Sequence, residues 1–305
     1  MSELFWPGDD RAGDLFGDRA LLAAMVAVES AWSGSPLEVP TGDLDVEAGG
    51  NAVIPLVEAL GPDHHRGLTS QDVLDTALVL LLRDAVARLD ADLDRALVAL
   101  DALVAAHGAT TVTGRTLTQP ALEIPLGHRL GQWRAGLADA RADLAALTYP
   151  VQCGGPVGTD TSGTARLAAA LGLADAPPWH TRRRPVTRAG DALVTTTDAC
   201  GHVARDVLEG SRLGELAEAR GGGSSSMPHK SNPVLSVLVR RAALTTPMLA
   251  ATLHLAAADQ VEERADGAWH AEWDTLRILV RRTVVAVSQT ADLLEGLQIQ
   301  GEVRA

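Results

Sequence analysis

Apolar residues recur at helical spacing along most of the chain. Between residues 14 and 32 they fall at three- and four-residue intervals, at Leu15, Leu21, Leu22, Met25, Val26 and Val28. Similar patterns predict helices over 52–60, 126–147, 190–220 and 271–295, and another that starts at Pro233. Loops rich in Gly and Pro separate them at 33–50, 61–62, 114–125 and 154–159. The pattern predicts an all-α fold.

The longest predicted helix runs from Thr69 or Ser70 to His107 without Pro or Gly. Thr69 and Asp72 have the spacing of a capping box. At about 1.5 Å per residue the helix would be roughly 60 Å long. Residues 78–82 are apolar on every side, so neighbours are expected all round. We therefore predict a long helical bundle that other copies of the chain complete. We also predict two domains: residues 1–107 form an N-terminal helical domain that leads into this helix, and residues 108–305 form the central bundle.

Composition favours the same fold and argues against one class of binding partner. Apolar residues make up 46% of the 305-residue chain and aromatic residues only 3%, which is typical of helices packed through aliphatic side chains. The formal net charge of -13 argues against a nucleic-acid surface. An anionic substrate would therefore have to be attracted by a local group of Arg, Lys and helix amides.

The sequence also predicts a cytoplasmic location. Cys153 and Cys200 have neither metal-binding nor redox spacing, which indicates a reducing compartment. The N-terminus lacks the basic-then-apolar order of a signal peptide. The densest apolar run, 76–82, is too short to span a bilayer.

One loop carries the most specific chemistry, with the sequence GGGSSSMPHKSNP at 221–233. GGGSSS alone is typical of a flexible linker, but the residues that follow it are not. The loop fits neither a phosphate-binding P-loop nor a Gly-x-Ser-x-Gly hydrolase turn. A serine hydroxyl can abstract a proton if an ammonium and backbone N–H groups stabilise the alkoxide. Lys230 can supply that charge.

Residues 223–233, GSSSMPHKSNP, resemble the G-S-S-x-M-P-x-K-x-N-P segment of the fumarase/aspartase superfamily. The resemblance implies that Ser224 is the general base. It also implies that Lys230 takes part in catalysis and, with Asn232, binds a substrate carboxylate.

A second segment, HRGLTSQD at 65–72, resembles the H-x-G-x-T-S-x-D element of the same superfamily. It implies that His65 is an acid or a substrate ligand and that Thr69, Ser70 and Gln71 bind substrate at a helix N-terminus. Simple helix capping by Thr69 and Ser70, and a solvated loop position for His65, are the alternatives.

A third segment, GRTLTQP at 114–120, resembles the G-R-T-H-x-Q-x element and implies substrate binding by Arg115, Thr116 and Gln119. Leu117 stands where fumarases and the adenylosuccinate and argininosuccinate lyases carry a histidine that assists the leaving group. A carboxylate that leaves or adds needs no such acid, because its pKa is about 4. Leu117 and the segment 263–273, with Arg264 as a further substrate ligand, indicate the cycloisomerase branch of the superfamily.

The resemblance covers about residues 15–298 and implies a reaction, a substrate and an oligomeric state. The expected reaction interconverts 3-carboxy-cis,cis-muconate and a carboxymuconolactone in protocatechuate breakdown, without metal or cofactor. The expected partners are a small tricarboxylate substrate and other copies of the chain, in a homotetramer with shared sites; nucleic acid and membranes are not expected. Superfamily members usually continue into a third helical domain where this sequence ends, so we expect that domain to be absent.

Two alternatives remain open at this point. One is an adenylosuccinate lyase or another fumarate-releasing lyase; the other is a non-catalytic oligomer on the same fold. Among the remaining residues, we expect 182–184 (Arg-Arg-Arg) to be a solvated loop, Trp269 and Trp273 to serve packing, and His180 to be an ordinary loop residue.

Overall fold

The computed structural model describes residues 4–219, 221–223, 227, 231–264 and 266–300. The elements within these ranges follow one another as η1 (Asp9–Ala12), α1 (Asp18–Ser33), α2 (Val46–Gly49), α3 (Val53–Leu60), η2 (Pro62–His65), α4 (Ser70–His107), β1 (Thr111–Thr116), β2 (Gln119–Pro125), α5 (Leu126–Ala145), α6 (Thr164–Leu171), α7 (Arg184–Leu213), β3 (Leu216–Glu218), α8 (Val234–Ala258), α9 (Gly267–Glu295) and β4 (Leu297–Ile299). The predicted all-α fold is confirmed, with short strands added.

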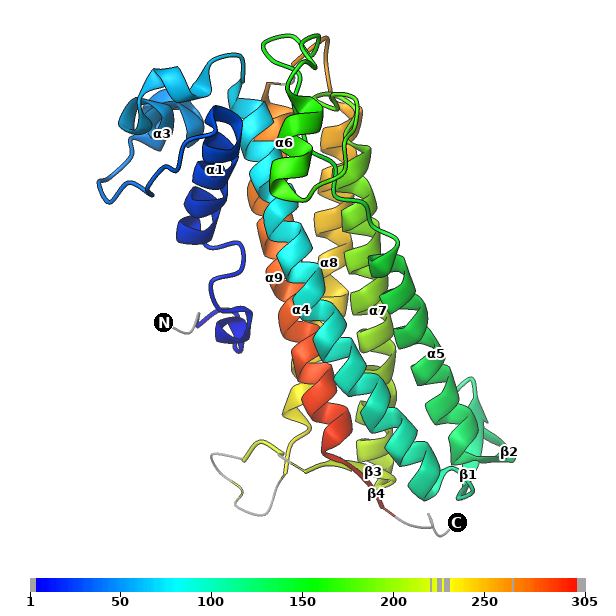
Figure 1. Ribbon diagram of the computed structural model, residues 1–305. Coiled ribbons are helices and arrows are strands. Elements are labelled where there is room, and N and C mark those ends of the chain that lie inside the picture. Colours follow the sequence, from blue (N-terminus) through cyan, green and yellow to red (C-terminus); the bar gives the residue numbers. More distant parts are fainter. Residues whose placement is uncertain (1–3, 220, 224–226, 228–230, 265, 301–305) are drawn as a thin grey trace.

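Five long helices, α4, α5, α7, α8 and α9, run side by side as an elongated bundle (Figure 1). The end that holds the start of α4, together with α1, α3 and α6, is called the upper end here; the end that holds β1–β2 and β3–β4 is the lower end. Successive bundle helices run in alternating directions, so α4, α7 and α9 all start at the upper end. The 38 residues of α4 make it about 57 Å long.

The middle of α4 is buried on every side, as predicted. Residues 78–82 are each at most 7% exposed, and α4 packs against α1, α5 and α9. Thr69 and Asp72 form the predicted capping box at its start. A helix enclosed in this way gains most of its stability from the burial of aliphatic side chains.

The predicted break at 114–125 is instead an antiparallel hairpin of β1 and β2. Its turn residues, Leu117 and Thr118, both have positive φ, of 49° and 68°. That geometry belongs to the two-residue turns that suit the twist of a hairpin. Pro120 and Pro125 led us to expect a loop, but both positions lie in an exposed two-stranded ribbon where proline is tolerated.

Helix α7 differs most from its predicted bounds, at both ends. Helix α7 begins at Arg184 and ends at Leu213, rather than spanning 190–220. It ends there because Gly214 adopts φ 74° and its N–H caps the carbonyls of Gly210 and Ser211. The chain then enters β3, which pairs with β4 after α9.

Among the described helices, α8 is long and apolar enough, by length and composition, to cross a membrane. A core helix of a soluble protein meets the same criteria. In this structure α8 packs against α7 and α9 along the bundle.

Candidate functional site

The upper end gathers five of the predicted site residues around the start of α4. His65 ends the 3-10 turn η2, Thr69 is the N-cap, and Ser70 and Gln71 open the helix. Arg264 reaches the same place from the segment between α8 and α9. Since the first amides of a helix attract anions, this end suits a carboxylate ligand.

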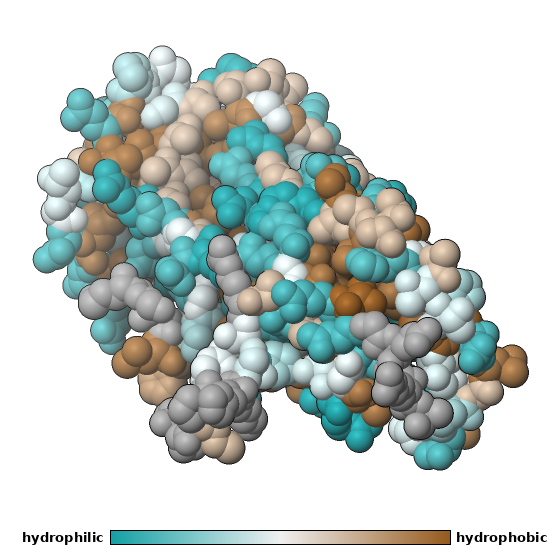
Figure 2. Space-filling model, turned by 90° about the horizontal axis from the view of Figure 1, so that it is seen from below, coloured by the Kyte–Doolittle hydropathy of each residue, from teal (hydrophilic) through white to brown (hydrophobic). Residues whose placement is uncertain are grey.

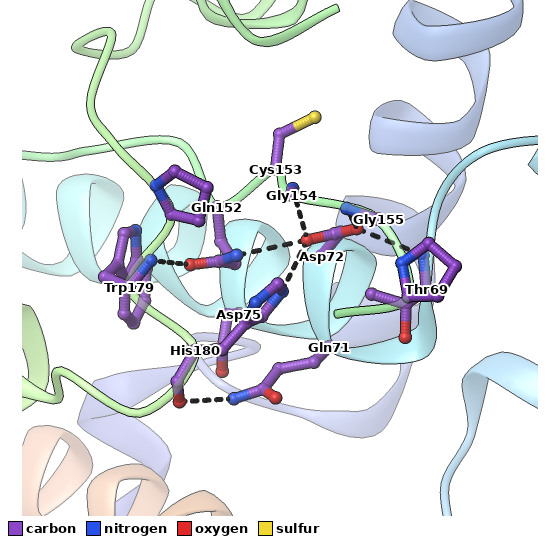
Figure 3. Close-up of polar contacts among 12 residues, drawn as sticks. Thr69, Gln71, Asp72, Asp75, Gln152, Cys153, Gly154, Gly155, Trp179 and His180 are labelled. Carbon is purple, nitrogen blue, oxygen red and sulfur yellow. Dashed lines mark hydrogen bonds and ion pairs between the residues drawn. The ribbon is translucent and has the colours of Figure 1, made fainter. Parts of the chain in front are cut away.

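Asp72, which the sequence marked only as a capping residue, is the centre of a buried network (Figure 3). Its carboxylate accepts five hydrogen bonds of 2.8–3.1 Å, from the amides of Thr69, Gly154 and Gly155, the side-chain amide of Gln152 and Nε2 of His180. Gly155 has φ 66°, which permits its amide to turn toward the carboxylate. The network fixes the 152–155 segment against α4.

Gln71 connects this network to Arg264. Its Nε2 donates to the backbone carbonyl of His180 at 2.8 Å, and its Oε1 accepts from Nη1 of Arg264 at 3.0 Å. The other guanidinium nitrogens of Arg264 donate to the carbonyls of Gly155 and Pro156. Burial lowers the pKa of Arg264, and the nearby Asp72 and Asp75 oppose that shift. A guanidinium keeps its proton in proteins, so Arg264 is a cation, and its hydrogen bonds hold Gln71 and the 155–156 backbone.

His65 is held from α1. Its Nδ1 lies 2.6 Å from Oε1 of Glu29, and its side chain is 20% exposed. The next residue is held as well, because Nε1 of Trp32 donates to the carbonyl of Arg66 at 2.8 Å. Of the two readings of His65 from the sequence, a freely solvated loop histidine is wrong.

The expected solvated loop at 182–184 is also wrong for its central residue. Arg183 is 2% exposed and its guanidinium lies between the carboxylates of Asp75 and Glu272. It also stacks on Trp179, and Trp269 donates to Asp75. Burial raises the pKa of Glu272, and Arg183 opposes that rise. A run of three arginines gave no sign that only the middle one is turned inward.

The lower end holds the hairpin residues. A guanidinium nitrogen of Arg115 donates to Glu215, which lies just before β3 and is almost fully buried. Thr116 and Gln119 are exposed on the hairpin, and the side chain of Leu117 at its tip is 96% exposed. Figure 2, seen from this end, shows hydrophilic and hydrophobic side chains interspersed over the surface.

The serine loop begins and ends at the lower end. Ser224 and Lys230 lie outside the described residues. The backbones of Gly222 and Asn232 pair in both directions at 2.8 Å, which closes the base of the loop. Glu218 accepts from the amides of Leu235 and Ser236 and so caps α8, directly after the loop.

The predicted site residues therefore form two sets, which lie at opposite ends of the helical bundle. His65, Thr69, Ser70, Gln71 and Arg264 lie at the upper end, whereas Arg115, Thr116, Gln119 and Asn232 lie at the lower end. The length of α4 separates the two sets by about 57 Å. Within the described ranges, no group of three or more His, Cys, Asp or Glu side chains is arranged to hold a metal ion.

Comparison with known proteins points to one family. The profile of a family described as Lyase matches residues 44–245. The 3-carboxy-cis,cis-muconate cycloisomerase of Bradyrhizobium diazoefficiens is 38% identical, over 91% of this chain and 67% of that protein. Nitrosuccinate lyase of Streptomyces davaonensis is 41% identical, over 78% of this chain and 55% of that protein. This chain thus spans between about half and two thirds of the length of these relatives.

The fold also matches the solved structure of a lactonizing enzyme. The 3-carboxy-cis,cis-muconate lactonizing enzyme of Pseudomonas putida superposes with a TM-score of 0.86 at 31% identity, over 94% of this chain and 74% of that one.

Proposed function

This chain belongs to the lyase family with the fumarase/aspartase fold, and from that membership we propose that it is a cycloisomerase that interconverts 3-carboxy-cis,cis-muconate and carboxymuconolactone. The observation that carries the proposal is Leu117, which stands at the exposed tip of the hairpin. The resemblance of residues 114–120 to the G-R-T-H-x-Q-x element implies that fumarases and the adenylosuccinate and argininosuccinate lyases carry a histidine at this position. A leucine cannot protonate a leaving group, which favours a reaction in which the group that adds or leaves is a weak base.

A carboxylate meets that requirement. In the lactonising direction, a carboxylate oxygen of the substrate forms a C–O bond to one carbon of the double bond. The electron pair of that double bond moves toward the conjugated carboxylate, which becomes a doubly charged aci-carboxylate. The hydroxyl of Ser224 then delivers a proton to the neighbouring carbon, and the reverse reaction removes it there. Lys230 offsets the charge of the serine alkoxide.

The positioning of the substrate falls to the remaining residues. At the start of α4 the proposed ligands are Thr69, Ser70 and Gln71, and the buried amide of Gln71 is bonded to Arg264 and His180 within the chain. At the lower end Arg115, Thr116, Gln119 and Asn232 offer cationic and polar groups. Arg264 adds a cation beside Gln71. Three substrate carboxylates need several such donors, since each left unpaired would cost binding free energy.

One chain cannot bring both ends to a single substrate, so the proposed site is shared between copies in a homotetramer. Helix α8 supports self-association, because Val237, Leu244, Met248 and Leu255 are exposed. Their offsets of 7, 11 and 18 residues place them within about 20° of one line along the helix. A single apolar stripe of this kind is typical of a helix that packs against another helix. A cytoplasmic location stays a prediction.

Nitrosuccinate lysis is a second candidate, favoured by the relative with 41% identity and by the same leucine. A nitro group leaves as nitrite, which is a weak base, so its departure needs no acid.

Purified protein should be assayed with 3-carboxymuconate, nitrosuccinate and adenylosuccinate. We expect turnover of carboxymuconate and its loss in Ser224→Ala. Turnover of nitrosuccinate alone would instead establish the second candidate, and turnover of adenylosuccinate alone would contradict both.

The shared site has its own test. Ser224→Ala and Gln71→Ala each remove one end of the site, so each variant alone should be nearly inactive. When the two are unfolded, mixed and refolded together, about a quarter of the sites should receive both intact residues from different chains. Recovery of that share of activity is expected. No recovery, or an active monomer in light scattering, would contradict sharing.

A further inference from the structure

Glu29 on α1 combines full burial with an incomplete set of hydrogen bonds. It is 0% exposed. Its Oε1 contacts Nδ1 of His65 at 2.6 Å. Its Oε2 is buried and has no hydrogen-bond partner among the described residues. A buried carboxylate with one unsatisfied oxygen costs free energy that an apolar side chain in the same place would not. Packing alone therefore does not explain a glutamate at this position.

The contact determines which ring nitrogen of His65 is available. A carboxylate only accepts hydrogen bonds, so Nδ1 carries the hydrogen and donates it to Glu29. Nε2 is then the nitrogen left for another partner, as an acceptor in the neutral ring or a donor in the charged one. The His65 side chain retains 20% exposure, so the ring is not sealed from the solvent.

A second contact from the same helix holds the turn that carries His65. Trp32 lies three residues after Glu29, on the same face of α1, and donates to the carbonyl of Arg66 at 2.8 Å. Arg166 of α6 stacks over Trp32 at 5.0 Å and donates to its carbonyl at 2.8 Å. The backbone beside His65 is thus anchored by α1, while Glu29 anchors the ring itself.

We propose that Glu29 is a positioning residue for the reaction: it fixes the ring of His65 with Nδ1–H toward α1 and presents Nε2 to the substrate at the start of α4. This inference rests on the proposed function, and on the resemblance of residues 65–72 that makes His65 an acid or a substrate ligand of that site. Carboxylates fix histidine tautomers in the same way in metal sites and hydrolase triads.

Kinetics on carboxymuconate test the proposal with four variants. His65→Asn should lower kcat about 100-fold, the usual share of an acid or base. Glu29→Leu should lower kcat similarly with KM changed less than about 2-fold, and Glu29→Gln only about 10-fold, because its amide oxygen still accepts from Nδ1. Glu29→Leu combined with His65→Asn should be no worse than His65→Asn alone. Glu58→Gln, which removes an exposed carboxylate from α3, is the matched control and should retain wild-type kcat.

Ring-nitrogen NMR of the histidines gives a readout independent of turnover. The His65 signal, identified by its loss in His65→Asn, should show hydrogen on Nδ1 in the wild type and in Glu29→Gln. In Glu29→Leu it should change to hydrogen on Nε2, the form that free imidazole side chains favour. If the wild type turns over no carboxymuconate, the proposed function fails, and this spectrum still decides the role of Glu29.

Three results would overturn the proposal. Full kcat in Glu29→Leu alongside a loss in His65→Asn would show that Glu29 does not act through His65. Full kcat in His65→Asn would remove His65 from the reaction. An unchanged ring spectrum in a folded Glu29→Leu protein would show that the tautomer is set by something else.

Discussion

The upper and lower ends of the bundle treat their polar groups in opposite ways. At the upper end, the carboxylate of Asp72 is fully buried and accepts five hydrogen bonds. At the lower end, Leu117 and Thr118 are exposed at a hairpin tip with positive φ, a conformation that costs a non-glycine residue about 1–2 kcal/mol. At the upper end the polar groups find their hydrogen-bond partners within the same chain, whereas at the lower end the hairpin residues are exposed to solvent.

This difference bears on how the proposed site is assembled. The upper set of residues is fixed by contacts within one molecule, from Glu29, His180 and Arg264. The lower set projects from a ribbon and a loop base, with only Arg115 tied to a buried partner, Glu215. In the proposed shared site, the fixed upper set of one copy would meet the exposed lower set of another. Stability measurements can probe each set separately.

The largest effect is expected from Arg183→Met at the upper end. The variant leaves Asp75 and Glu272 buried without their cation, which typically costs about 3–5 kcal/mol. The raised pKa of Glu272 adds a pH dependence. Without Arg183, which opposes this rise, the pKa of Glu272 should rise further in the variant. A carboxyl whose pKa is raised by folding lowers stability as pH rises from its unfolded value through its folded value, so the loss should be greater at alkaline than at mildly acidic pH.

Urea unfolding at two pH values measures this, with the exposed Arg184→Met as control. Equal stability of the two variants would mean that the ion pairs of Arg183 with Asp75 and Glu272 do not stabilise the upper end.

Asp72→Asn should have the next largest effect. In either orientation, its NH2 group would face at least two N–H donors, so we expect a loss of about 2–3 kcal/mol. Amide hydrogen exchange at Gly154 and Gly155 should accelerate in the variant. Asp63→Asn, which changes an exposed carboxylate on η2, should stay within about 0.5 kcal/mol of the wild type. Unchanged exchange at both glycines would contradict the role of Asp72 as the centre of the network.

Thr118→Gly should act in the opposite direction. Glycine adopts positive φ without strain, so the variant should gain up to about 1 kcal/mol in unfolding free energy. Thr113→Gly, in the same hairpin but without positive φ, should instead lose about 0.5–1 kcal/mol. If both variants lose stability, the hairpin tip is not strained and the contrast between the ends is weaker than stated.

The smallest effect is expected at a surface ion pair between the two ends. Arg141 donates to Asp90 and lowers the pKa of that carboxyl. A lowered pKa contributes stability above the unfolded value of about 4, which is lost as pH falls through the folded value. Arg141→Gln should therefore cost less than about 1 kcal/mol at neutral pH and nothing in strong acid. If Arg141→Gln lost the same unfolding free energy in strong acid, the loss would come from packing of the arginine stem and not from the ion pair.

The helices were predictable because their signals are local. The capping box at Thr69 and Asp72 and the uninterrupted run to His107 located α4 correctly. The β1–β2 hairpin was missed because its turn uses Leu117 and Thr118 instead of the Asn and Gly that usually mark such a turn. The end of α7 was missed because Gly214 was passed over in favour of the more conspicuous glycines at 221–223.

The site was predictable only as separate motifs. Ser70, Gln71 and Arg115 are candidates from their family patterns, and nothing in those patterns shows which ends of the bundle they occupy. Partners brought from distant segments had no local signal: Glu29 lies 36 residues from His65, and Gln152 lies 80 residues from Asp72. The boundary between the two predicted domains at residue 107, and the roles of Ser224 and Lys230, stay predictions.

The length of α4 also limits how this protein can change. Each inserted residue would rotate one end of the helix by about 100° relative to the other and move it about 1.5 Å. A single insertion between Leu82 and Leu93 would turn the hairpin out of phase with the Asp72 network. A block of eleven residues, close to three full turns, would keep the phase but lengthen the molecule by about 16 Å. Length variants that function should therefore carry whole-turn blocks, matched in the antiparallel helices beside α4.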